Sequence, residues 1–256
     1  MTSRTYRAQL PKGFETRTEA DERRLRLAGV LRQGNKAERL LANKLKRCDD
    51  DSRCHSGACP VCVGQFRVDL LREGEVVLEE FKDWVGASIV PAGFLFAPGK
   101  LGDFDPAAMA KMIGKRLERH FPDVPVVIGG VDISFNLTDN KAGVWQPHLY
   151  LIMQGKPSGR LVNRLKAAFA GEPLANRPVH IQALYSHRGP LTYVFKSVFN
   201  RRSTYFFRSK QRVRTQSLKD PELRELAVAL DRFPLGTRLI LKGVRRSGGS
   251  PMRLIL

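Results

Sequence analysis

The chain has 256 residues, of which 44 are Lys or Arg and 25 are Asp or Glu, so its formal net charge is +19. With 42% hydrophobic residues it can bury a sizeable core, which excludes a disordered basic tail. No apolar run is long enough to span a membrane, and the first residues lack the apolar stretch of a secretory signal. We therefore expect a cytoplasmic protein with a polyanionic partner, most often nucleic acid.

The positive charge is concentrated at the two ends of the chain. Residues 1–47 carry a net +8 and residues 156–256 a net +16, whereas residues 48–155 carry a net −5. This distribution predicts a basic nucleic-acid-binding surface beside a mildly acidic centre. A merely solubilising surface is the alternative, but mixed charges would serve that purpose with less imbalance.

Hydrophobic spacing predicts a helical N-terminal region followed by mixed strands and helices. The first helical region, 18–47, is expected to break at Gly34 and Asn35. Further helices are predicted at 64–82, 105–120, 158–170, 190–200 and 220–231, and strands at 88–99, 124–137, 144–155, 178–185 and 237–244. Turn residues between the second and third strands indicate an antiparallel hairpin. The predicted fold class is α+β, an antiparallel sheet with flanking helices.

All four cysteines lie within fifteen residues, at Cys48, Cys54, Cys59 and Cys62, and His55 follows the second. Four thiolates close a tetrahedral zinc site, and Cys59 and Cys62 have the spacing of a zinc knuckle. Disulfides are the alternative, disfavoured because there is no secretory signal and the chain is too large to need them. We predict a small structural Zn²⁺ segment with no open position for catalysis, in which His55 could replace one cysteine.

The predicted strand at 144–155 carries His148, and the neighbouring strand carries Asp132. An acid within an apolar strand is costly unless it is paired or metal-bound. The two side chains could share a divalent ion, Mg²⁺ or Mn²⁺, or they could form a buried hydrogen bond without a metal. Strand alternation places Tyr150 on the same face as His148.

Tyr193 and Lys196 are three residues apart in the helix predicted at 190–200, which would place them on one helical face. A tyrosine hydroxyl can attack a phosphodiester when cations stabilise the developing charge. A core tyrosine with a solvated lysine is the alternative.

A basic stretch follows, with six cations in residues 201–214 and aromatic residues among them. Because cations track phosphates and rings stack on unpaired bases, we predict nucleic-acid binding by Arg201, Arg202, Arg208, Lys210, Arg212 and Arg214. A core strand at 205–207 flanked by solvated charges is the alternative. Residues 243–249 are expected to form a flexible basic segment.

The order of these motifs resembles the rolling-circle plasmid replication initiators of the HUH endonuclease superfamily. The resemblance spans roughly residues 47–200. It rests on a Cys-rich segment ending in Cys59-Pro60-Val61-Cys62, a strand with Trp145-Gln146-Pro147-His148-Leu149-Tyr150, and a helix with Tyr193-Val194-Phe195-Lys196. The family motif has a second histidine where this chain has Tyr150. His180 or His187 could compensate, and His180, within a predicted strand, is the better placed.

The resemblance implies an HUH, ferredoxin-like core that binds and nicks origin DNA, single-stranded or hairpin, to start replication. His148 and Asp132 would hold the divalent metal. Tyr193 would attack and stay linked to the 5′ phosphate, while Lys196 assists. Host replication proteins would be further partners. Tyr150 keeps two alternatives open: a non-catalytic DNA-binding protein of the same fold, and a zinc-stabilised RNA-binding or regulatory protein.

The expected domain organisation has four parts. They are a basic helical segment at 1–47, the zinc-binding segment at 48–66, an HUH-like core at 67–215 and a basic helix–strand extension at 216–256.

Overall fold

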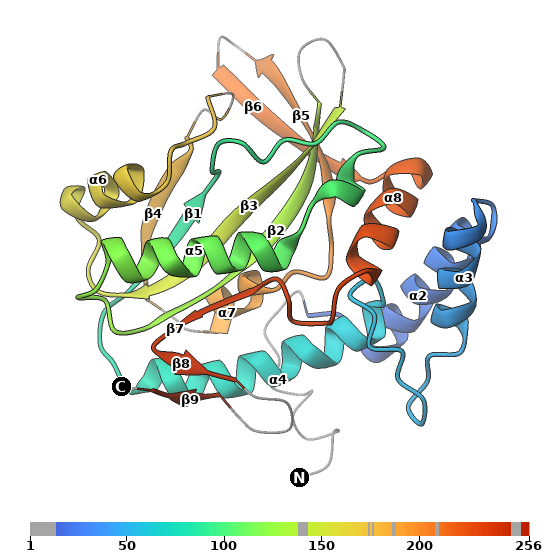
Figure 1. The fold of residues 1–256 in the computed structure, drawn as a ribbon, viewed down its shortest axis with the longest axis horizontal. Coiled ribbons are helices and arrows are strands. Elements are labelled where there is room, and N and C mark those ends of the chain that lie inside the picture. The colour runs from blue at the N-terminus through green and yellow to red at the C-terminus, as the bar shows by residue number, and fades with distance from the viewer. Residues whose placement is uncertain are drawn as a thin grey trace.

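The computed structural model describes residues 14–137, 143–173, 175, 177–185, 188–207, 210–246 and 252–255. A curved sheet lies at its centre, with strand order β4-β1-β3-β2-β5-β6 and with β7 joined to β2 (Figure 1). The strands are β1 (Trp84–Ile89), β2 (Val127–Leu137), β3 (Gly143–Gln154), β4 (Val179–Leu184), β5 (Asn200–Phe207), β6 (Lys210–Ser217) and β7 (Leu239–Lys242). The helices are α2 (Arg17–Arg32), α3 (Lys36–Lys46), α4 (Pro60–Glu79), α5 (Pro106–His120), α6 (Gly159–Ala168), α7 (Arg188–Val194) and α8 (Asp220–Asp231).

This architecture confirms the predicted α+β class. The hairpin of β2 and β3 pairs antiparallel over its whole length, from Val127 opposite Met153 to Leu137 opposite Gly143. The sheet is mixed in one place, because β2 and β5 run parallel. No helix in the described part of the chain is long and apolar enough to cross a membrane.

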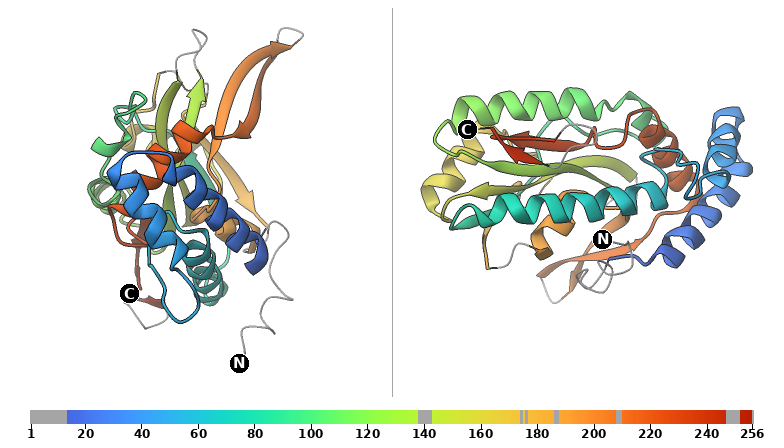
Figure 2. Two further views of the ribbon diagram at one scale, coloured as in Figure 1. Left: turned by 90° about the vertical axis from the view of Figure 1, so that its right-hand side faces the viewer. Right: turned by 90° about the horizontal axis from the view of Figure 1, so that it is seen from below.

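The two faces of the sheet have different characters. Side chains of alternate residues point to opposite faces of a strand. One face carries Val131 and Leu149 into a large apolar core beneath α5 and α6. The other face packs Ile128 and Ile152 against α4 and α7 at one end only. Figure 2 shows the sheet between α5 on one side and α4 on the other.

Farther along this second face the side chains become polar. Asp132 lies directly opposite His148, and Tyr150 lies opposite Gly130. The apolar packing with α4 and α7 therefore gives way to a polar end of the same face, and this polar end contains the candidate site.

The N-terminal helices follow the prediction closely. The chain breaks between α2 and α3 at Gly34, and Asn35 caps α3. Thr16 caps α2 in the same way, since its side chain accepts from the Glu19 amide. Arg24, buried on α2, donates to the Leu45 carbonyl at the end of α3 (2.7 Å), which holds the two helices together.

Three predicted elements differ from the structure. Strand β1 covers Trp84–Ile89 and ends before Pro91, which has no amide for the sheet ladder. Helix α7 ends at Val194, so Lys196 lies beyond it and the predicted shared helical face with Tyr193 is wrong. Of the segment expected to be flexible, Val244–Arg245 forms strand β8, paired with β9 (Arg253–Leu254), and residues 247–249 lie outside the described residues.

Strands β5 and β6 form a two-stranded arm that extends from the body of the molecule (Figure 2). At the end of the arm nearest the body, β5 pairs with β2 of the sheet and β6 leads into α8.

Gly130 allows the end of α7 to approach the sheet closely. A methyl group at this position would overlap the carbonyl oxygen of Val194. We expect Gly130→Ala to lower the free energy of unfolding by about 1–3 kcal/mol, because overpacking displaces α7. Gly114→Ala is the matched control: the space around it on α5 is open, so it should stabilise by about 0.5–1 kcal/mol through helix propensity. Urea unfolding measures both, and equal effects of the two substitutions would contradict this packing.

Candidate functional site: a cysteine cluster and a buried carboxylate

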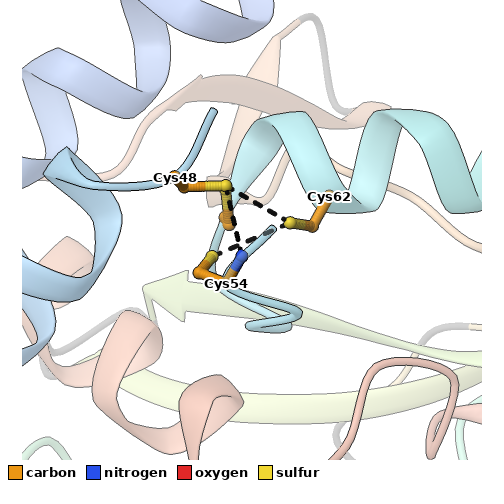
Figure 3. Close-up of side chains that lie close together, drawn as sticks. Cys48, Cys54 and Cys62 are labelled. Atoms are coloured by element: carbon orange, nitrogen blue, oxygen red, sulfur yellow. Dashed lines mark hydrogen bonds between the residues drawn. The ribbon is translucent and has the colours of Figure 1, made fainter. Parts of the chain in front are cut away.

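The four cysteines converge at the start of α4. Figure 3 shows three of their sulfur atoms turned toward one another. The ligand atoms of all four cysteines lie within 4.8 Å of one another. The individual Sγ–Sγ distances are 3.5 Å between Cys48 and Cys62, 3.7 Å between Cys54 and Cys62, and 3.7 Å between Cys48 and Cys59.

These distances fit a tetrahedral zinc ion. A Zn–S bond of about 2.3 Å gives sulfur–sulfur edges of about 3.8 Å, whereas a disulfide needs about 2.05 Å. Backbone amides support the thiolates: the Cys54 amide donates to Cys48 Sγ (3.4 Å), and the Ser56 and Cys62 amides donate to other cysteines of the cluster. Hydrogen bonds from Cys54 and Cys59 lower the pKa of the Cys62 thiol. The cluster can therefore hold Zn²⁺ with thiolates alone.

The His55 side chain is not among the grouped ligands, although its backbone hydrogen-bonds the Cys62 thiol. His55 is exposed and adopts a left-handed backbone conformation with φ of 51°, which turns the loop between Cys54 and Cys59. The cluster belongs to an apolar core that joins α2 and α3 to α4 and α8. Its role in the fold is thus to attach the N-terminal helices.

A second constellation lies at a gap in the sheet. On the edge of β2 away from β3, β7 pairs with β2 as far as Gly130, and β5 pairs with β2 only from Phe135 onward. Among the described strands, none pairs with the β2 residues between these two points. Arg238 fills the gap: its guanidinium donates to the Val131 carbonyl (2.9 Å), and its own carbonyl accepts from the Val131 amide (2.8 Å). The next free amide, that of Ile133, donates to the Asp132 carboxylate (2.9 Å).

The other carboxylate oxygen of Asp132 has two nitrogen partners. Lys196 Nζ lies 2.5 Å from Oδ2, and His148 Nε2 lies 3.1 Å from the same atom. Asp132 is only 6% exposed. Burial by itself would raise the pKa of this carboxyl, but its interactions with His148 and Lys196 hold the pKa well below its usual range. Asp132 is therefore an ionised carboxylate with hydrogen-bond partners on both oxygens.

The loop that carries Lys196 is held by three arginines. Arg238 donates to the Lys196 carbonyl (3.2 Å) and lies over the Phe195 ring, 4.2 Å from its centre. Arg67 of α4 donates to Ser197 Oγ (2.9 Å), and Arg23 of α2 donates to the Ser197 carbonyl (3.0 Å). Burial lowers the pKa of Arg238 to about 10, so it keeps its charge at neutral pH. The position of Lys196 is thereby fixed after the helix has ended.

Tyr193 is the accessible tyrosine beside this cluster. Its side chain is 56% exposed, and its ring centre lies 5.5 Å from Lys196 Nζ. The Tyr150 side chain is half-buried, and the centre of its ring lies 5.9 Å from the centre of the Tyr193 ring. Burial raises the pKa of the Tyr150 phenol, opposed by a hydrogen bond with Gln182. Of the two phenols, Tyr193 is the one that a large substrate can reach.

The residues expected to bind a divalent metal are already engaged with other groups of the protein. His148 Nε2 lies 3.1 Å from the Asp132 carboxylate, and its Nδ1 lies 3.2 Å from the Gln146 carbonyl, so both ring nitrogens face protein oxygen atoms. Among the described residues, the only group of three or more His, Cys, Asp or Glu placed to hold a metal is the cysteine cluster.

His180, the histidine expected to compensate for Tyr150, does not lie beside it. His180 on β4 is opposite Ser88 on β1, and Ser88 in turn is opposite Tyr150 on β3, so β1 separates the two residues. His180 is exposed at the sheet edge, and His187 lies outside the described residues.

The predicted nucleic-acid-binding cations have different environments. Arg201 forms an ion pair with Glu222 (2.7 Å) and lies over Phe135, so it contributes to the join between the arm and α8. Arg202 is half-buried, while Arg212 and Arg214 on β6 are exposed. Lys210 begins β6, and Arg208 lies outside the described residues.

Arg238 and Arg67 were not predicted as site residues. In the sequence, Arg238 is a cation at the start of a predicted strand and Arg67 is a cation within a predicted helix, a pattern that ordinary surface cations share. Their hydrogen bonds to the β2 edge and to the loop after α7 arise only in the tertiary structure.

Comparison of the chain with protein-family models, with curated proteins and with solved structures finds no match. The resemblance to the HUH replication initiators accordingly rests on the motifs quoted above.

The cysteine geometry predicts one tightly bound Zn²⁺ per chain. Cys59→Ser should abolish stoichiometric zinc and lower the melting temperature, because α2 and α3 lose their attachment to α4. Elemental analysis and thermal unfolding measure the two effects. His55→Ala is the control and should keep its zinc; loss of zinc in this variant would contradict the four-thiolate assignment.

Proposed function

We propose that this protein binds DNA and cuts one strand through Tyr193. The observation that carries the proposal is the exposed Tyr193 phenol beside the Lys196 ammonium, at the polar end of the sheet. A tyrosine nucleophile needs access to the phosphodiester and a cation that stabilises the developing negative charge. Both requirements are met within one short stretch of chain.

The charge of the protein supports a DNA substrate. The net charge of +19 favours a polyanion. The arm formed by β5 and β6 extends from the body (Figure 2), and Arg212 and Arg214 on β6 are exposed. We infer that the arm contacts the phosphate backbone while the strand to be cut lies over the polar end of the sheet. By its resemblance to rolling-circle initiators, the protein would act in the cytoplasm at a replication origin, together with host replication proteins.

The chemistry is a transesterification. The Tyr193 oxygen forms a bond to phosphorus, the bond from phosphorus to the 3′ oxygen breaks, and the 5′ phosphate remains on the tyrosine. The phenolic proton passes to water and the departing 3′ oxygen takes a proton from water, so the step needs no further reactant.

A second candidate function is DNA binding without cleavage. It is favoured by Tyr150 in place of the second motif histidine and by an Asp132 carboxylate that already has Ile133, His148 and Lys196 as partners. A protein of this kind would keep the basic arm and the zinc segment but would leave the DNA intact.

The two functions are separated by a covalent-adduct assay. The protein is incubated with labelled single-stranded DNA drawn from origin sequences, with and without Mn²⁺, and analysed on denaturing gels. We expect a labelled adduct that Tyr193→Phe abolishes, because phenylalanine has no nucleophilic oxygen.

Tyr185→Phe is the matched control, since Tyr185 is 98% exposed and lies just before α7 without contacting Lys196. This variant should form the adduct like the parent. An adduct equally lost in both variants, or none with any sequence, would contradict strand cleavage by Tyr193 and leave DNA binding as the function.

A further inference from the structure

We propose that the cation at this site is Lys196 itself, and that strand cleavage proceeds without a divalent metal. The proposal rests on the proposed function for its catalytic part, while the exclusion of the metal stands on geometry alone. Its basis is the Asp132 carboxylate, the acid that a metal would need, because Oδ2 already has Lys196 and His148 as partners and Oδ1 accepts the Ile133 amide.

A divalent ion bound to Asp132 would have to lie beside the Lys196 ammonium, which is 2.5 Å from the same carboxylate oxygen. The backbone that carries this side chain is held in place, because Arg238 donates to the Lys196 carbonyl and Arg67 and Arg23 donate to Ser197. Binding a metal would therefore break an ion pair at a carboxylate that is 6% exposed and would place like charges together.

The possible ligands of a metal already have partners within the protein. Both ring nitrogens of His148 face oxygen atoms, and Oδ1 of Asp132 accepts the Ile133 amide. Tyr150 offers a phenol of raised pKa, hydrogen-bonded to Gln182, which is a poor ligand compared with imidazole.

The Lys196 ammonium lies close to Tyr193. Its side chain is 24% exposed, and its Nζ lies 5.5 Å from the centre of the Tyr193 ring. An ammonium carries three donors, and Asp132 accepts one of them. The remaining donors can bind a phosphate oxygen and stabilise charge as the Tyr193 oxygen attacks, while Asp132 and His148 hold the ammonium in place.

The experiment has two readouts on zinc-loaded protein, with zinc content measured before and after chelation. In the first, adduct formation is followed in EDTA and in Mn²⁺, and we expect the same initial rate in both. Lys196→Met should reduce the rate by about 100-fold, because it removes a transition-state charge, and Mn²⁺ should not restore it. An adduct that forms only with Mn²⁺ would overturn the proposal.

The second readout is Mn²⁺ binding, followed by the electron paramagnetic resonance signal of the free ion. The parent protein should leave this signal unchanged. Lys196→Met should bind Mn²⁺ more tightly than the parent, because the Asp132 carboxylate becomes available, and Lys196→Arg should not. Stoichiometric Mn²⁺ binding by the parent that Asp132→Asn abolishes would overturn the proposal. If no adduct forms under any condition, strand cleavage is contradicted, while this titration still decides whether Lys196 excludes the metal.

Discussion

A buried carboxylate must be neutralised, and in this protein the neutralisation of Asp132 determines the arrangement around it. The sheet leaves one stretch of the β2 edge without a partner strand, and Arg238 and Asp132 supply the missing hydrogen bonds there. The negative charge of Asp132 then requires cations, which come from His148 on β3 and from Lys196 on the loop after α7. Because α7 ends just before this ion pair, Tyr193 is left exposed above the polar end of the sheet.

The zinc segment and this polar site are connected through α2. The cysteine cluster lies in the core that joins α2 to α4 and α8. Arg23 of the same helix donates to the Ser197 carbonyl, one residue after Lys196. The N-terminal helices attached by the cysteines thus also help to position the loop of the candidate site, and loss of zinc would affect both.

Much of this structure could be predicted from local patterns. The cysteine spacing indicated a four-thiolate cluster, and alternation along 124–155 indicated the hairpin that sets Asp132 opposite His148. Both alternatives for His148 and Asp132, a hydrogen bond or a shared metal, required the two side chains to meet, and the structure brings them within 3.1 Å. The third partner could not be foreseen, because the spacing of Tyr193 and Lys196 suggested a continuous helix. Helix α7 ends at Val194, where arginines from distant segments bind the backbone that follows.

The central claim is that the Asp132 carboxylate is paired with Lys196 and His148 and that this group of residues does not bind a divalent metal. It is tested most directly by ¹⁵N NMR of the His148 ring, assigned with a His148→Gln variant, before and after addition of excess Mg²⁺. The account predicts ring-nitrogen signals that do not change with Mg²⁺. A ring-nitrogen signal that shifts on addition of the metal would contradict it.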